Sequence, residues 1–421
     1  MHRSKWMYAA CAALLAGVTA ILGGVQAGQD SAHEFNAAGV GHYNAGEWDK
    51  AIDAFETALL LSPENGTLRR NLANTFQAYA NQRASRGDFE GAIDLLDEAI
   101  QVDPENPAPL TQHGAYSLRL ERVRDAVFRL EEAVELDPFD NDALELLGDA
   151  YYRANDLSAA MTAWRAVLTS DPNRPGLADK LDKAEREATV EGNFRRAASQ
   201  NFEVSYPPHI TGNEQQRVLT VLERAYRDIG RRMANAFPPA PIQVIVYTAE
   251  DFSQATQLGD HVGAVYDGKI RIPVQDAQGN SLDSDELERR LYHEYVHVVV
   301  RYLAGDHVPW WYNEGLAETL SKELSTRDLE MLRRAEAGGN LYSLADLEGG
   351  QLGRMGADEL RLAYVQSHAA VDYLWRRFGA SGMINYLAAI DRGADGAEAL
   401  REAYNRTHDA LEQEVVREYV R

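Results

Sequence analysis

The chain has 421 residues, more than one ordinary domain needs, and this length indicates two or three domains with a hydrophobic core each. Its composition, 45% hydrophobic and 25% charged, is typical of a globular protein. The net charge of −23 argues against a nucleic-acid partner and against attraction to anionic membranes, because like charges repel.

Residues 1–27 are predicted to be a secretory signal peptide. Basic residues at the start are followed by an apolar stretch from Trp6 to Val25, and Val25-Gln26-Ala27 has the small-x-small pattern of a cleavage site. The alternative is an uncleaved anchor, since about 20 mostly apolar residues can span a bilayer. We therefore expect an exported protein, periplasmic or secreted, that contacts a membrane only if this segment is retained.

An internal repeat begins after this segment. The segments EWDKAIDAFETALLLSP, DFEGAIDLLDEAIQVDP, RVRDAVFRLEEAVELDP and DLSAAMTAWRAVLTSDP align without gaps, and their last prolines are 41, 34 and 34 residues apart. Each segment has an alanine twelve residues before its proline and a bulky residue four further on. Small residues allow paired helices to approach closely, and proline ends the second helix of each pair. The period and the pattern resemble tetratricopeptide repeats.

This resemblance implies an α-solenoid over residues 28–172 with a concave groove for a protein or peptide partner. The alternative is that the repeats only support the C-terminal domain. Seven extra residues around Thr75 to Arg86 are expected to lengthen one helix by two turns. Residues 173–199 are charged with apolar residues at helical spacing, and we interpret them as a capping or linker helix.

From residue 200 to the end, the pattern predicts a domain of α+β type. NFEVSY and PIQVIVYT are typical of strands, with a helix between them near residues 214–235. The stretch HVGAVYDGKIRIPV predicts a hairpin that turns at Asp267-Gly268. Beyond Asp283 almost all of the chain is expected to be helical.

The helix predicted from Asp283 or Ser284 to near Gly305 contains LYHEYVHVVV, residues 291–300. His293 and His297 are one helical turn apart, so both imidazoles lie on one face, at a spacing that suits one metal ion. Glu294 lies close enough to reach a water on that metal without being a ligand. The alternative is a pair of histidines packed between helices.

A second helix is predicted from WWYNEGLAE, and sixteen residues separate His297 from Glu314. Packed against the first helix, it would place Glu314 beside the two imidazoles. Two nitrogens and one carboxylate with an open fourth position are typical of catalytic zinc. Glu318, one turn further on, could accept the ring N–H of His293 and orient it, or it could be a solvated helix charge.

These residues resemble those of the gluzincin metallopeptidases, in which HExxH on one helix is followed by NE on the next. The resemblance implies His293, His297 and Glu314 as ligands of Zn²⁺ and Glu294 as general base. The NEGLAE context is most similar to the peptidase MA-like domain that is often fused to tetratricopeptide repeats, and this similarity covers roughly residues 200–421. The expected fold is therefore mainly α with a small β component: an N-terminal solenoid followed by an α+β zincin-like domain.

Two further assignments concern the substrate. The oxyanion that forms during hydrolysis needs a donor besides zinc, and we assign this role to Tyr364, with His368 one turn later as its rival and ordinary packing as the alternative. The strand at residues 268–274 could pair with an extended substrate at the sheet edge, as the family suggests, unless that strand is internal.

The sequence therefore predicts a zinc-dependent endopeptidase that hydrolyses a protein substrate, with repeats that recruit the substrate or an adaptor. The spacing between the two motifs is shorter than in the large aminopeptidases, and no exopeptidase motif is visible. The alternative is a non-catalytic envelope interaction or scaffold protein whose peptidase-like domain serves as a docking module.

Overall fold

The computed structural model describes residues 31–421 except 211, 258–263, 277 and 350–354. The predicted signal peptide, residues 1–27, lies outside the described residues. No helix in the described part of the chain is long and apolar enough to cross a membrane. The chain forms two compact units: one runs to Tyr116 and includes Arg129–Pro138, and the other comprises Ser117–Phe128 and Phe139–Arg421.

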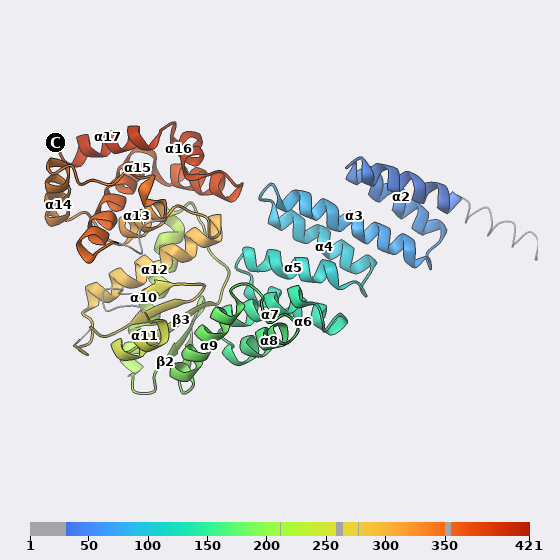
Figure 1. Ribbon diagram of the computed structural model, residues 1–421, viewed down its shortest axis with the longest axis horizontal. Coiled ribbons are helices and arrows are strands. Elements are labelled where there is room, and N and C mark those ends of the chain that lie inside the picture. The colour runs from blue at the N-terminus through green and yellow to red at the C-terminus, as the bar shows by residue number, and fades with distance from the viewer. Residues whose placement is uncertain (1–30, 211, 258–263, 277, 350–354) are drawn as a thin grey trace, which may run out of the picture. The chain divides into compact units, whose positions relative to one another are not determined.

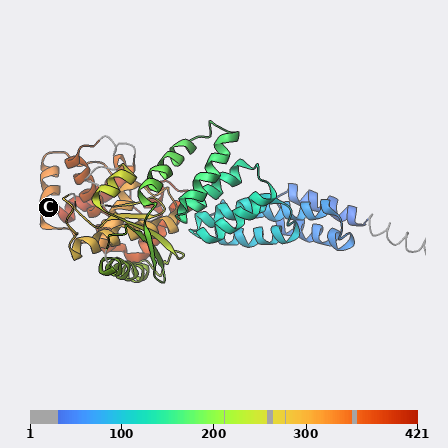
Figure 2. The same ribbon diagram turned by 90° about the horizontal axis from the view of Figure 1, so that it is seen from below.

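Paired helices form the repeats. Their bounds are α2 (Trp48–Leu61), α3 (Gly66–Ala84), α4 (Phe89–Val102), α5 (Pro107–Arg119), α6 (Val123–Leu136), α7 (Asn141–Arg153) and α8 (Leu157–Ser170). Within the first unit, α2, α3 and α4 lie side by side as antiparallel neighbours in both views (Figure 1 and Figure 2). The repeat alanines and the bulky residues four positions later are buried, which matches the predicted pattern. The expected extension is present, since α3 has 19 residues where α5 and α7 have 13.

After the repeats, α9 (Leu177–Glu191) leads into a five-stranded sheet. The strands are β1 (Arg195–Ala198), β2 (Phe202–Tyr206), β3 (Ile242–Tyr247), β4 (Val265–Tyr266) and β5 (Ile270–Pro273), in the order β1-β2-β3-β5-β4. The three central strands are parallel and the two edge strands are antiparallel to their neighbours. Strand β1 lies inside the stretch for which the sequence predicts a capping or linker helix. It was not predicted because its sequence RRAA has no apolar alternation that would indicate a strand.

Of the two alternatives for the strand at residues 268–274, the structure supports the internal position rather than the sheet edge. Strand β5 pairs with β3 on one side and, at Ile270 and Arg271, with β4 on the other, so it is an internal strand of the described sheet. The hairpin itself is confirmed, with Gly268 at a φ of 99° in the turn. Strand β4 occupies the edge, because the short hairpin folds it back beside β5.

Both faces of the sheet are covered. Val244 and Val246 of β3 belong to the core shared with α10 (Gly212–Arg232) and α12 (Ser284–Ala304), whereas Ile245 and Tyr247 pack in a smaller cluster with α11 (Ala249–Thr256). Alternate side chains of a strand point to opposite faces, so burial on both sides explains the unbroken apolar run IQVIVY.

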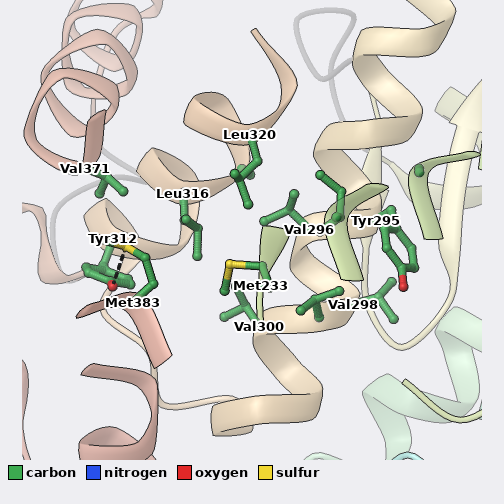
Figure 3. Packing of buried hydrophobic residues seen from close by; sticks show 14 of the residues in the cluster. Met233, Tyr295, Val296, Val298, Val300, Tyr312, Leu316, Leu320, Val371 and Met383 are labelled. Atoms are coloured by element: carbon green, nitrogen blue, oxygen red, sulfur yellow. Dashed lines mark hydrogen bonds between the residues drawn. The ribbon is translucent and has the colours of Figure 1, made fainter. Parts of the chain in front are cut away.

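The rest of the chain is helical: α13 (Trp310–Ser321), α14 (Thr326–Ala337), a short 3₁₀ helix (Asp346–Glu348), α15 (Ala357–Asp391), α16 (Gly396–Tyr404) and α17 (His408–Tyr419). Figure 3 shows the core where α12 meets α13: Val296 of α12 lies close to Leu316 and Leu320 of α13. In the same core the hydroxyl of Tyr312 lies 3.0 Å from the sulfur of Met383 (Figure 3). The predicted fold class, mainly α with a small sheet, is confirmed.

Candidate metal centre and active site

Helix α12 begins and ends at strong local signals. The Asp283 side chain accepts a hydrogen bond from the backbone N–H of Glu286 at 2.8 Å, and the helix ends before Gly305, whose φ is 67°. Between these caps, Val296 and the valines at 298–300 are buried. This packing fixes the rotation of the helix and turns His293, Glu294 and His297 toward α13.

Helix α13 packs closely against α15 because of one glycine. A Cβ at Gly315 would overlap the backbone carbonyl of Ser367 and the side chain of Val371. Only a residue without a side chain permits this contact. It holds Glu314 and Glu318 of α13 between the histidines of α12 and the wall formed by α15.

The structure brings His293, His297 and Glu314 together, with one potential ligand atom of each within 4.8 Å of the others. Nε2 of His293 lies 3.2 Å from Oε2 of Glu314, and Nε2 of His297 lies 3.6 Å from the same oxygen. Ligands held 2.0–2.1 Å from a tetrahedral zinc ion are separated by about 3.3 Å. The donor set and its spacing therefore fit zinc.

Each imidazole is also contacted at its other nitrogen. Nδ1 of His293 lies 3.2 Å from Oε1 of Glu318, an ion-pair distance, although the two atoms are not aligned as a hydrogen bond. Nδ1 of His297 hydrogen-bonds to Oδ1 of Asn313 at 2.9 Å. These outer contacts direct both Nε2 atoms toward Glu314. Sequence reasoning missed Asn313, although its place directly before Glu314 on the same helix was a signal.

The carboxylates of the site are buried and incompletely satisfied. Glu294 is 4% exposed, and its Oε2 has no hydrogen-bond partner among the described residues; Oε2 of Glu314 has no aligned hydrogen bond either, but both imidazoles lie at ion-pair distance from it. A buried carboxylate oxygen without a partner is costly, so Oε2 of Glu294 favours a water or a cation beside it. Burial raises the pKa of Glu294, as befits a group that takes up a proton during a reaction.

In the metal-free protein, the histidine and glutamate side chains of the candidate site favour each other's charged forms. Burial alone would lower the pKa of His293, but the carboxylates of Glu314 and Glu318 outweigh it and raise that pKa to about 10. Burial alone would raise the pKa of Glu314, but the two imidazoles outweigh it and hold this pKa well below its usual range. A metal ion must therefore displace a proton from His293 when it binds.

Helix α15 forms the opposite wall. Tyr364 lines the same cavities as His293 and Glu294, and its ring packs edge-on against Trp310 with 4.9 Å between ring centroids. Burial and the nearby carboxylates raise the pKa of Tyr364, so it remains a hydrogen-bond donor. His368 lies further along; it is 1% exposed, its Nε2 has no described partner, and burial lowers its pKa.

Two cavities meet at this centre. One, of about 340 Å³, extends past β4 and Asn313, and the other, of about 480 Å³, extends along α15 toward Arg361. Both are lined by Ala264, His293, Glu294 and Tyr364. A further cavity of about 610 Å³ between α14, α15 and α17 contains none of the metal-ligand residues. The paired cavities therefore offer a path for an extended ligand across the candidate metal centre.

We expect Asn313→Ala to weaken zinc binding about 10- to 100-fold while the protein stays folded, because the His297 ring loses the contact that orients it. The dissociation constant is measured by competition with a chelator, and folding is checked by circular dichroism. Unchanged zinc affinity would mean that packing alone holds His297.

The fold and the site define a protein of helical repeats that continue into a zincin-like α+β domain. Comparison with known families agrees: residues 234–420 match the Peptidase MA superfamily, and residues 112–175 and 32–65 match tetratricopeptide repeat families. The chain therefore joins tetratricopeptide repeats to a peptidase MA superfamily domain, as the sequence resemblance implied.

Solved structures that are similar to this chain cover only part of it. The first TPR domain of the human RPAP3 protein is 25% identical over 27% of this chain and 89% of its own, with a TM-score of 0.26. MamA from Desulfovibrio magneticus RS-1 is 20% identical over 37% of this chain and 84% of its own, with a TM-score of 0.30. The Sgt2 TPR domain from Aspergillus fumigatus is 19% identical over 34% of this chain and 93% of its own, with a TM-score of 0.28. Comparison with curated proteins found no match.

Proposed function

We propose that this protein is a zinc metalloendopeptidase of gluzincin type that hydrolyses peptide bonds of a protein substrate. One observation carries the proposal: two imidazole nitrogens converge on the carboxylate of Glu314 while the carboxylate of Glu294 lies buried and unpaired beside them. Three potential ligands with a separate carboxylate are what metal-assisted hydrolysis requires. The alternative function, a docking module without activity, does not require these three ligands and the additional carboxylate.

In the proposed mechanism, His293, His297 and Glu314 hold the metal, and Glu318 and Asn313 orient the two imidazoles. Zinc, when bound, supplies positive charge that acidifies a water molecule and polarises the peptide carbonyl. Glu294 takes a proton from the attacking water and delivers it to the leaving nitrogen, and its raised pKa suits both steps. The hydroxyl of Tyr364 donates a hydrogen bond to the developing oxyanion.

The metal assignment is tested by zinc content. Protein purified without chelator should contain about one zinc ion per chain, and His297→Ala should lose most of it, because a ligand nitrogen is removed. His307→Ala is the matched control, since His307 is exposed just beyond α12 and does not line the site. Equal zinc in wild type and His297→Ala, or no zinc in either, would refute the site.

Tyr364→Phe should lower kcat about 100- to 1,000-fold with little change in KM, because the hydroxyl acts on the oxyanion rather than on the ground-state carbonyl. His368→Ala is measured beside it at saturating substrate, with zinc content checked in both variants. A near-normal kcat for Tyr364→Phe with a severe loss for His368→Ala would transfer the role to the histidine. Normal values in both would place the donor elsewhere.

For the rest of the chain we propose that residues 28–172 recruit the substrate or an adaptor protein in the repeat groove, as stacked helical repeats allow. Residues 173–199 would connect them to the peptidase domain at 200–421. We further propose export to the periplasm or the exterior, with residues 1–27 as the cleaved signal peptide.

A further inference from the structure

The cavity of about 480 Å³ along α15 carries four cationic side chains from three parts of the fold. They are Arg289 and Arg290 of α12, Lys322 just after α13, and Arg361 of α15. Three carboxylates, those of Glu294, Glu318 and Asp328, line the cavity as well, so its formal charge is 4 − 3 = +1, whereas the whole chain has a net charge of −23. A cation in a concave site attracts ligands of the opposite sign when no carboxylate neutralises it.

The acidic groups of this cavity are already engaged. Glu318 contacts His293 and forms an ion pair with Lys322. Asp328 accepts hydrogen bonds from the backbone and the hydroxyl of Ser325, at 3.0 and 2.7 Å, in the capping box of α14. Among the carboxylates that line the cavity, only Glu294 is left without such a partner, and it faces the metal centre.

The cations of the cavity differ in their pairing. Arg289 and Arg290 both contact one carboxylate, that of Glu286, at distances of 2.6 to 2.9 Å. Arg361 is exposed and makes no ion pair with any described residue. The positive charge of the cavity that pairs with no described carboxylate is therefore that of Arg361.

A second, independent feature indicates a ligand. His368 is 1% exposed and lines the same cavity, and its Nε2 has no partner within the part of the chain that the structure describes. Buried polar atoms are rarely left unpaired, so this nitrogen favours a polar group in the cavity. Arg361, Tyr364 and His368 are three and four residues apart on α15 and therefore share one face of the helix.

We propose that this cavity is a substrate subsite that binds a carboxylate next to the cleaved bond, either an acidic side chain or the C-terminal carboxylate of a peptide. Arg361 is the specificity-determining residue, and His368 offers a neutral hydrogen bond deeper in the cavity. The position follows from the lining, because His293, Glu294 and Tyr364 belong both to this cavity and to the reaction centre. The inference rests on the proposed function, which it extends to acidic substrates.

The test measures binding separately from hydrolysis. Zinc-loaded Glu294→Gln protein is titrated by fluorescence anisotropy with peptides of one neutral sequence that carry a single Glu or Gln at each position in turn. Each peptide is made with an amidated and with a free C-terminus, so the two sources of a carboxylate are distinguished. We expect one Glu position or the free C-terminus to strengthen binding, with an advantage that falls as salt rises.

Arg361→Gln should reduce that advantage about fivefold, the upper range for an exposed ion pair, and Arg361→Lys should retain part of it. Arg401→Gln, the same change at an exposed arginine of α16 outside the cavity, should have no effect. Arg361→Glu should reverse the preference in favour of a Lys peptide. Equal binding of Glu and Gln peptides, or a preference that survives Arg361→Gln, would overturn the subsite.

Failure of the subsite and failure of the proposed function give different results. Hydrolysis of the peptides by wild type without any carboxylate preference in binding would refute the subsite and leave the peptidase assignment standing. A carboxylate preference that depends on Arg361, without hydrolysis by wild type, would support the subsite and count against the peptidase assignment.

Discussion

Glu294→Gln is expected to lower kcat about 100- to 10,000-fold while the protein keeps its fold and its zinc. Glutamine matches glutamate in size but cannot accept the proton of the attacking water. Glu294 is not one of the three groups that converge on a common point, so metal binding should not depend on it. The measurements are kcat at saturating substrate, zinc per chain, and the circular dichroism spectrum.

Glu288→Gln is the matched control, because Glu288 lies on the same helix but forms an ion pair with Arg224, and it should leave kcat unchanged. Cleavage by Glu294→Gln at the wild-type rate would contradict the mechanism. Absence of cleavage by the wild type, across many substrates and with zinc present, would instead favour the non-catalytic docking function.

Glu187→Gln is expected to destabilise the second compact unit by about 3 to 5 kcal/mol, because it removes one partner from a buried group of charges. Lys269 and Arg271 of the β5 region are both 0% exposed and face α9. Oε2 of Glu187 lies 2.6 Å from Nη2 of Arg271 and 3.5 Å from Nζ of Lys269. Arg271 also contacts Glu191, at 2.9 Å, and the carboxylate of Asp267.

Glu185→Gln is the matched control on the same helix, since Glu185 is 46% exposed and pairs with Arg165; it should cost less than about 1 kcal/mol. Stability is measured by urea denaturation, and the transition is monitored by loss of bound zinc together with circular dichroism, because two units need not unfold together. Equal effects of the two variants would show that the buried charges contribute nothing specific.

The motifs of the candidate site could be read from the sequence because helical geometry relates spacing to direction. His293 and His297 lie on one face of α12, as a spacing of four requires, and the caps of this helix are local signals. Glu314 was found because its motif marks a second helix. Asn313 was missed because its contact with His297 depends on how two helices pack, which spacing within one helix does not determine.

Strand order was beyond local reasoning for a similar reason. A β-branched segment such as IRIPV indicates a strand but not its neighbours, and the position of β5 depends on pairing with β3 across more than twenty residues of sequence. The burial of Lys269 and Arg271 was equally beyond local reasoning. Both are buried because α9 supplies their partners, and the residues next to them in the sequence do not indicate this.

The buried charges also bear on how such a protein can evolve. Glu187 and Glu191 belong to a helix beyond the last repeat, Tyr152 on α7 hydrogen-bonds to both Glu187 and Arg271, and the cations belong to the peptidase sheet. A single exchange of sign at any of these positions leaves an unpaired charge in the interior, so related chains should change them together or not at all. Gene recombination should therefore transfer α7 and α9 together with the sheet that holds the partners of their side chains.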